Sequence, residues 1–100
     1  MNNSNLSKIF AQVADLLQIR GDNIHRVLSY RRAAETLSDL PHDINHIAEK
    51  GELTSIPGIG KTLAEKIEEI LTTGELDFLN RLTDEIPITI LDLLKIEGMG

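Results

Sequence analysis

The sequence predicts an all-α fold, a compact bundle of four to five short helices. Two features predict it. Apolar residues recur at intervals of three and four from Leu6 to Leu71, which is the spacing of helices that bury one face. Glycine or proline interrupts this pattern at short intervals, so each helix ends soon after it begins. A chain of 100 residues forms at most one domain with a modest hydrophobic core.

Capping and breaking residues set the bounds of the expected helices. Ser4 or Asn5 can cap the first helix, and Gly21 ends it. Pro41 breaks the chain after the second helix, and Gly74 stops the fourth. The expected helices cover about 5–20, 23–38, 44–50, 61–73 and 76–82.

The second expected helix has an arginine among its apolar residues. Helical spacing defines the inner face of this helix, and Arg31 falls within that arc. Two interpretations of Arg31 stay open: an ion pair inside the domain, with Glu35 one turn later, or a contact to phosphate. The predicted inner face consists of Ile24, Val27, Leu28, Ala34 and Leu37.

The C-terminal residues contain a partial repeat. Pro87 and the apolar residues after it favour a helix over a strand. Residues 94–100, LKIEGMG, resemble residues 53–60, LTSIPGIG, and stop where a following helix would begin. We therefore expect a helical domain over 1–83, and a linker or helix with the truncated start of a second hairpin motif over 84–100. We also expect the chain to be cut from a longer protein.

Composition narrows the classes of function. The chain has no cysteine, which excludes disulfides, thiolate zinc sites and cysteine nucleophiles. Aromatic residues make up only 3% of it, which argues against a surface that stacks bases. The net charge of −6 argues against coating nucleic acid by bulk charge, although the arginines from Arg20 to Arg32 can form a local basic patch. No apolar run is long enough to span a membrane, so we expect a cytoplasmic location and no membrane partner.

A glycine-rich turn at residues 56–62, IPGIGKT, carries the strongest functional signal. Its glycines permit backbone angles and a close approach that a side chain would forbid. The helix that follows presents unpaired N–H groups and the positive end of its dipole to an anion. A phosphate can therefore be bound by the main chain, without reading of bases. The candidate DNA-binding residues of this turn are Gly58, Ile59, Gly60, Lys61 and Thr62.

The same turn resembles a helix-hairpin-helix motif. The resemblance covers residues 53–71, and it includes the spacing of Ala64 after the glycines and the apolar faces on both sides. It implies binding to the DNA backbone without sequence specificity. The alternative is a tight turn between two helices that binds no ligand.

A longer series of motifs, over residues 5–100, resembles the N-terminal domain of family X DNA polymerases, the DNA polymerase beta group. The resemblance implies a compact helical domain of a DNA repair polymerase. Such a domain would bind the 5′-phosphate side of gapped or nicked DNA as a monomer, beside the remaining domains of its own polymerase. The acidic composition is more similar to a bacterial or archaeal member. The motifs are, in order, His25-Arg26, Tyr30-Arg31-Arg32, Leu40-Pro41-His42, the hairpin and Thr73-Gly74-Glu75-Leu76.

In some members of that family the domain also removes 5′-deoxyribose phosphate through an imine formed on a lysine. The resemblance places Lys66 at the position of that lysine and Glu65 at that of a proton-handling carboxylate. It places His25, Arg26 and Tyr30 along the DNA pocket. Lyase chemistry requires no cofactor, but the resemblance implies a monovalent cation, K⁺ or Na⁺, at the main-chain carbonyls of Thr54, Ile56 and Ile59.

Departures from the family pattern leave lyase activity open. Thr62 and Phe78 stand where the animal enzymes carry phosphate-binding lysines, so we expect weaker 5′-phosphate binding. Lys66 lies just outside the apolar arc of its helix, at the rim where a stem is partly buried and the amine faces a pocket. The alternative for Lys66 is a solvated residue paired with Glu65 or Glu69.

A function without DNA also stays open. The acidic charge is compatible with a protein-interaction or structural domain that keeps a vestigial hairpin. His42 and His46 lie four residues apart, but they have no third ligand at a suitable spacing for a metal site. No constellation of paired aspartates for nucleotidyl transfer is visible, so any enzymatic activity of this chain depends on Lys66.

Overall fold

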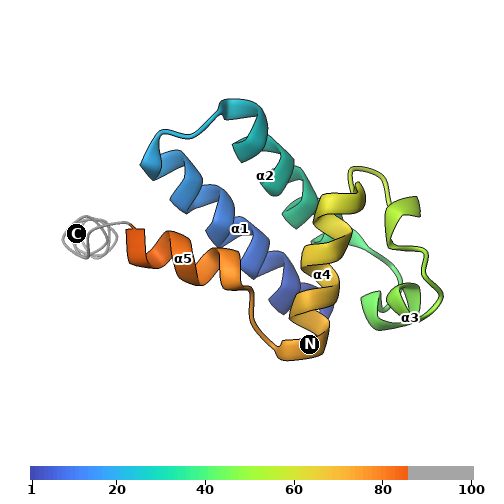
Figure 1. Ribbon diagram of the computed structural model, residues 1–100. Coiled ribbons are helices and arrows are strands. Elements are labelled where there is room, and N and C mark those ends of the chain that lie inside the picture. Colours follow the sequence, from blue (N-terminus) through green and yellow to red (C-terminus); the bar gives the residue numbers. More distant parts are fainter. Residues whose placement is uncertain (86–100) are drawn as a thin grey trace, which may run out of the picture.

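The computed structural model describes residues 1–85, which form five α-helices and one short 3₁₀ helix (Figure 1). No strand occurs among these residues, and the predicted all-α fold is confirmed. The last helix continues to Glu85, three residues beyond the expected end. The helices are α1 (Asn3–Arg20), α2 (Ile24–Asp39), α3 (Ile44–Glu49), η1 (Leu53–Ser55), α4 (Lys61–Thr73) and α5 (Asp77–Glu85).

The predictions for the C-terminal residues fall outside this range. The helix expected from near Pro87 and the truncated hairpin motif at 96–100 lie beyond the described residues. The predicted domain boundary at residue 83 stays a prediction.

Helix α1 begins earlier than expected. Asn2, rather than Ser4 or Asn5, caps it, because the side-chain oxygen of Asn2 accepts a hydrogen bond from the Asn5 N–H at 2.7 Å. The first turn is further tied to the start of α3, since the Asn3 side chain accepts a hydrogen bond from the Ile44 N–H at 2.9 Å. The predicted stop at Gly21 is confirmed: Gly21 has a φ of +81° and donates its N–H to the end of α1.

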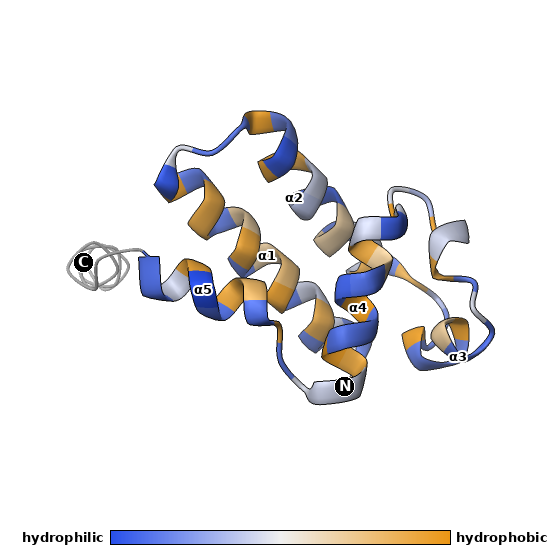
Figure 2. Cartoon of the chain, viewed as in Figure 1, coloured by the Kyte–Doolittle hydropathy of each residue, from blue (hydrophilic) through white to orange (hydrophobic). Residues whose placement is uncertain are grey.

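The core forms where α2 and α5 pack on α1. Figure 2 shows orange and blue residues alternating along each helix, as expected for helices with one apolar and one polar face. Phe10 of α1 is fully buried and stacks on Tyr30 of α2, with ring centroids 5.8 Å apart. Leu82 of α5 and Ile67 of α4 complete this core, so all the long helices share it.

The predicted inner face of α2 was partly wrong. Ile24 and Leu28 are 56% and 37% exposed, while Tyr30 and Ala33 are buried in their place. The helix is rotated because the aromatic ring of Tyr30 fills the space between α1 and α5, and the small Ala33 permits close packing on α1.

This rotation also explains Arg31. The residue lies at the edge of the inner face and forms an ion pair with Asp15 of α1 at 3.0 Å, with Gln18 as a second acceptor. The predicted intradomain ion pair therefore exists, but its partner is on another helix and not Glu35.

Candidate nucleic-acid interface

A shallow pocket of about 430 Å³ lies between α2 and the start of α4. It joins residues of α2 with residues of the glycine turn and of the first two turns of α4, although Tyr30 and Gly58 are 28 positions apart in the sequence. Most of the residues predicted for DNA contact therefore come together here. The lining residues are Arg26, Ser29, Tyr30, Gly58, Gly60, Lys61, Thr62, Leu63 and Lys66.

The glycine turn is anchored by its apolar residues. Ile56 and Ile59 are 5% and 3% exposed, and the Ile59 N–H donates to the Ile56 carbonyl oxygen at 3.0 Å. Pro57 and Gly58 are the two central residues, and Gly58 has a φ of +84°, as a type II turn requires. With both isoleucine side chains directed into the core, the glycine main chain is left at the surface.

The first N–H groups of α4 have no partner in the described part of the chain. Gly60 is the N-cap and makes no side-chain capping bond, and the first main-chain bond runs from the Ala64 N–H to the Gly60 oxygen at 2.9 Å. The N–H groups of Gly60, Lys61 and Thr62 donate to no acceptor among residues 1–85. A Cβ built on Gly58 or Gly60 would have no atom within 4 Å, so the turn is uncovered. Unpaired N–H groups at the positive end of the helix dipole therefore face open space, as an anion site requires.

Two cations of the pocket lie beside one aromatic ring. The Lys66 Nζ is 4.7 Å from the centre of the Phe78 ring, and the Arg26 Cζ is 5.0 Å from it. Arg26 also approaches Asp22, with 3.4 Å between the guanidinium and the carboxylate. Lys61 is exposed at the start of α4.

Lys66 does not form the ion pair considered in the sequence-based alternative. Among the ion pairs within residues 1–85, none joins it to Glu65 or Glu69. The Glu69 carboxylate instead accepts a hydrogen bond from the Asp77 N–H at 2.7 Å, at the start of α5. The amine of Lys66 is thus available to the pocket.

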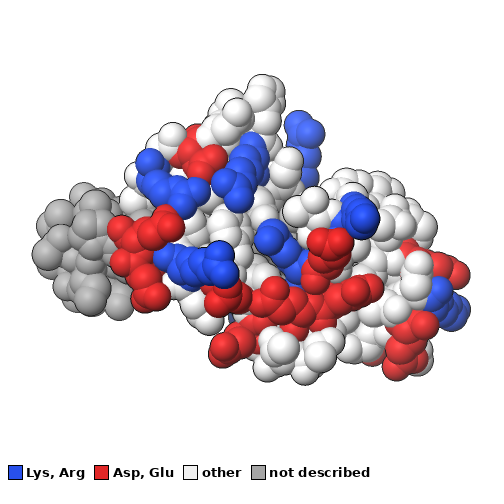
Figure 3. Space-filling view, viewed as in Figure 1, with Lys and Arg blue, Asp and Glu red and all other residues white. Residues whose placement is uncertain are grey.

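Charges are separated on this face of the molecule (Figure 3). Blue basic side chains lie over α2 and the start of α4, while a belt of red acidic side chains crosses the lower part of α4 and the beginning of α5. Of the arginines from which a local basic patch was expected, only Arg26 lines the pocket, and Lys61 and Lys66 supply its other positive charges. Arg20 and Arg31 form ion pairs with acidic residues instead.

Tyr30 contributes a buried phenol to the pocket wall. Its side chain lines the pocket although the residue is only 3% exposed. Burial raises the pKa of Tyr30 above its ordinary value of 10.0, against the opposing effect of the nearby Arg26 charge. The phenol therefore stays neutral at physiological pH and can donate a hydrogen bond.

Three predicted residues do not present their side chains to the pocket. His25 and Glu65 are exposed but do not line it, and the Ile59 side chain is buried under the turn. The Ile59 N–H is also used within the turn, so it is not one of the unpaired donors.

Sequence reasoning missed two residues of this region. Ser29 lines the pocket, and its position three residues after Arg26 could have indicated a face shared with that residue. Phe78 was considered only as a lost lysine, and no local signal shows that its ring lies beside Arg26 and Lys66.

The proposed cation ligands have partly free oxygens. Within the described residues, the carbonyls of Thr54 and Ile59 accept no main-chain hydrogen bond, whereas the Ile56 carbonyl accepts from the Ile59 N–H. Carbonyl oxygens are ligands that hard cations accept, so the donor set fits a monovalent ion. Residues 1–85 hold no cluster of three His, Asp or Glu side chains suited to a metal ion, so His42 and His46 gain no third ligand there.

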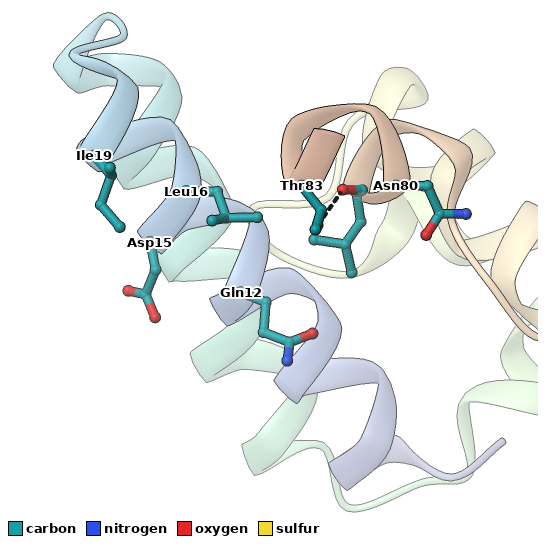
Figure 4. A pocket seen from close by; sticks show the side chains of 7 residues that line it. Gln12, Asp15, Leu16, Ile19, Asn80 and Thr83 are labelled. Carbon is teal, nitrogen blue, oxygen red and sulfur yellow. Dashed lines mark hydrogen bonds between the residues drawn. The ribbon is translucent and has the colours of Figure 1, made fainter. Parts of the chain in front are cut away.

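A second pocket, of about 370 Å³, lies between α1 and α5 (Figure 4). Its lining includes Asp15 and contains no Lys or Arg. Leu16 and Ile19 contribute apolar surface from α1, and Thr83 closes the α5 side with its hydroxyl bonded to the Leu79 carbonyl at 3.0 Å. This pocket lacks the positive charge that phosphate binding needs.

The helix-hairpin-helix domain family matches residues 1–76. The chain belongs to this family. The match covers the glycine turn, the whole pocket and α1–α4, so the resemblance of residues 53–71 to a helix-hairpin-helix motif is confirmed. No helix within residues 1–85 is both long and apolar enough to cross a lipid bilayer.

Relatives of this helix-hairpin-helix domain are family X DNA polymerases. The DNA polymerase/3′-5′ exonuclease PolX of Bacillus subtilis (strain 168) is 29% identical over 100 residues, 100% of this chain and 17% of the relative. DNA polymerase lambda of Arabidopsis thaliana is 32% identical over 99 residues, 98% of the chain and 18% of the relative. The rat (Rattus norvegicus) DNA polymerase lambda is 30% identical over 86 residues, 86% of the chain and 14% of the relative. The predicted resemblance to the N-terminal domain of family X polymerases is confirmed, and the chain spans less than a fifth of these relatives' length.

Proposed function

We propose that this helix-hairpin-helix domain binds DNA without sequence specificity, at the 5′-phosphate side of a gap or nick, as part of a DNA repair polymerase. One observation carries the proposal. The unpaired N–H groups at the start of α4 open into the same pocket as Arg26, Lys61 and Lys66. Main-chain donors and charged side chains that converge in this way bind phosphate oxygens without contacting bases.

A terminal 5′-phosphate suits this pocket better than the middle of a strand. The pocket is a shallow hollow of about 430 Å³ at the start of α4. A terminal phosphate carries more negative charge than a phosphodiester and can enter such a hollow end-on. The remaining domains of the polymerase would hold the rest of the DNA.

A second candidate function is 5′-deoxyribose-phosphate lyase activity of Lys66, and the availability of its amine favours this function. The neutral amine would attack the sugar aldehyde and release water to form an imine. Loss of a C2′ proton would then break the C3′–O bond and release the strand with its 5′-phosphate. Glu65 would handle that proton only if bound DNA brought the sugar over the exposed side of α4.

A monovalent cation, K⁺ or Na⁺, would be bound by the carbonyls of Thr54, Ile56 and Ile59. It would supply positive charge behind the glycine turn. The turn itself holds the N–H groups in place through the buried side chains of Ile56 and Ile59.

The deciding experiment for DNA binding is an NMR titration with a gapped duplex, with and without its 5′-phosphate. We expect amide shifts at residues 58–66 and at Arg26, and tighter binding to the phosphorylated duplex. Amide shifts confined to other residues would contradict the proposal. An absence of DNA-induced amide shifts at residues 56–66 would favour the alternative of a protein-interaction or structural domain, for which the exposed Ile24 and Leu28 on α2 offer an apolar surface.

The lyase activity is tested separately by borohydride trapping of the protein on 5′-incised abasic DNA. We expect a covalent adduct that Lys66→Ala abolishes and that the control Lys8→Ala, on α1, leaves unchanged. An adduct of equal yield in Lys66→Ala would remove Lys66 from the role. No adduct with any variant would leave DNA binding alone.

A further inference from the structure

Phe78 brings together two pocket cations from different helices. Its ring lies 4.7 Å from the Lys66 Nζ of α4 and 5.0 Å from the Arg26 Cζ of α2, both within the range of cation–π attraction. Phe78 itself does not line the pocket. The ring therefore contacts the two side chains from behind, and an anion in the pocket would meet the cations and not the ring.

The ring is held firmly in place. Phe78 is half-buried and lies against Tyr30, with ring centroids 6.1 Å apart, and Tyr30 stacks in turn on the fully buried Phe10. The chain next to Phe78 is fixed as well, because the Asp77 N–H is bonded to the Glu69 carboxylate. A row of three aromatic rings thus runs from the core to the cations.

The aromatic ring of Phe78 offsets an energetic cost of holding two cations together in the pocket. Two positive side chains beside each other repel, and long side chains lose rotamer freedom when a ligand orders them. The negative face of one ring attracts both charges and orders both stems before the ligand arrives. Such preorganisation reduces the free-energy cost of ordering the two side chains when the ligand binds.

We propose that Phe78 is a positioning residue for the phosphate pocket: its ring holds Arg26 and Lys66 together at the pocket in the DNA-free protein. The proposal rests on the proposed function, since the two cations are the ones assigned there to the 5′-phosphate. From the sequence, Phe78 was interpreted only as the loss of a phosphate-binding lysine. The proposal gives its aromatic ring a role of its own. In this proposal a residue of α5, outside the hairpin, orients the Lys66 side chain of α4.

The test compares Phe78→Leu, which keeps apolar bulk without a π face, with Phe78→Tyr, which keeps the ring. In the DNA-free wild type, ring currents should shift the Lys66 Hε and Arg26 Hδ proton resonances upfield. The Leu variant should lose these shifts and bind 5′-phosphorylated gapped duplex about threefold to tenfold more weakly. The Tyr variant should restore both. Leu79→Ala, a half-buried neighbour that faces the other pocket, controls for a loosened α5.

The two arms separate this proposal from the proposed function. Absence of the upfield shifts in the wild type, or unchanged DNA affinity in Phe78→Leu, would overturn the role of Phe78. Weaker binding by Phe78→Tyr equal to that of Phe78→Leu would overturn it too. Equal affinity of the wild type for phosphorylated and unphosphorylated duplex, with the upfield shifts present, would overturn the proposed function instead.

Discussion

Gly58 and Gly60 serve the same turn for different physical reasons. Gly58 has a φ of +84°, a conformation that strains any residue with a side chain. Gly60 has an extended backbone, with a φ of −88° and a ψ of −175°, which every residue adopts readily. Neither has an atom within 4 Å of a built Cβ. The fold therefore does not require glycine at position 60. The absence of a side chain there matters only for the approach of a ligand.

This difference predicts that alanine at position 58 affects stability, whereas alanine at position 60 affects DNA binding. Gly58→Ala should lower the free energy of unfolding by about 1–2 kcal/mol through backbone strain. Gly60→Ala should leave the free energy of unfolding within about 0.5 kcal/mol of the wild type, but it should weaken DNA binding because its methyl meets the incoming phosphate. Urea unfolding and a DNA-binding titration check the two effects. Full affinity in Gly60→Ala would show that the phosphate does not approach this turn.

Asp22 would compete with a bound phosphate for Arg26. Its carboxylate lies 3.4 Å from the Arg26 guanidinium and binds Arg20 at 2.5 Å. Asp22→Asn removes a negative charge beside the pocket, so affinity for gapped DNA should rise by a fewfold. A fluorescence anisotropy titration at low salt measures this. The control is Asp43→Asn, which changes a carboxylate that caps α3 and does not line the pocket, and the DNA affinity of this variant should not rise.

The same carboxylate links stability to pH. The hydrogen bond from Arg20 lowers the pKa of Asp22 below its ordinary value of 3.8. Asp22 therefore stabilises the folded state above about pH 4, and this contribution is lost as the pH falls through its lowered pKa. The stability difference between wild type and Asp22→Asn should shrink as the pH falls below 3.8. A difference that stays constant from pH 6 to pH 2 in urea unfolding would contradict this linkage.

At the scale of the elements, α5 depends on α4. The Glu69 carboxylate caps the start of α5 by accepting the Asp77 N–H at 2.7 Å, and the hydroxyl of Thr73 accepts from the Glu75 N–H in the turn between them. The turn itself ends α4 at Gly74, whose φ is +85°. Because Phe78 lies in the first turn of α5, this junction also sets the position of the ring beside the pocket.

Removal of that cap should affect stability and binding together. Glu69→Ala should lower the free energy of unfolding by about 1 kcal/mol, the usual cost of a lost N-cap. It should also weaken DNA binding, although it removes a negative charge, because the ring beside Arg26 and Lys66 is no longer held. Glu68→Ala is the matched control, since Glu68 is exposed on the same helix. If Glu69→Ala binds DNA more tightly, as Glu68→Ala should through charge alone, α5 does not support the pocket.

For the whole molecule, local charge and net charge oppose each other. The chain has a net charge of −6, yet three cations converge on the pocket while the acidic residues lie mostly elsewhere on this face. A polyanion is therefore repelled at long range and attracted only at close range. Salt weakens both effects, but contacts with phosphate would release counterions and would dominate the salt dependence of DNA binding.

The salt dependence should report these few contacts. With three cations on the phosphates, the logarithm of the binding constant should fall with the logarithm of salt concentration with a slope of about −2 to −3. Lys61→Ala should reduce the slope by about 1, whereas Lys50→Ala, at the exposed end of α3, should leave it unchanged. A slope near zero for the wild type would exclude phosphate contacts as the source of binding.

Local rules in the sequence determined the helices, their glycine stops and the exposed hairpin. These features depend on neighbouring residues only: the helical spacing of apolar side chains, the capping groups, and the conformational freedom of Gly58. Most residues of the pocket could be predicted as well, because the glycine turn and the series of motifs mark them. The first turn of α1 was misplaced because the capping side chain, Asn2, lies one turn ahead of the first apolar residues.

Only the tertiary structure decided the rotation of α2, the pairing of Arg31 with Asp15, and the place of Phe78 beside Arg26 and Lys66. Each of these depends on which side chain from a distant part of the chain fills a shared space. Packing of Tyr30 between Phe10 and Phe78 turned α2, and it left Ile24 and Leu28 outside, although both are more apolar than tyrosine. Close packing depends on the shape of side chains as well as on their hydrophobicity. Shape complementarity between helices cannot be predicted from the spacing of apolar residues within one helix.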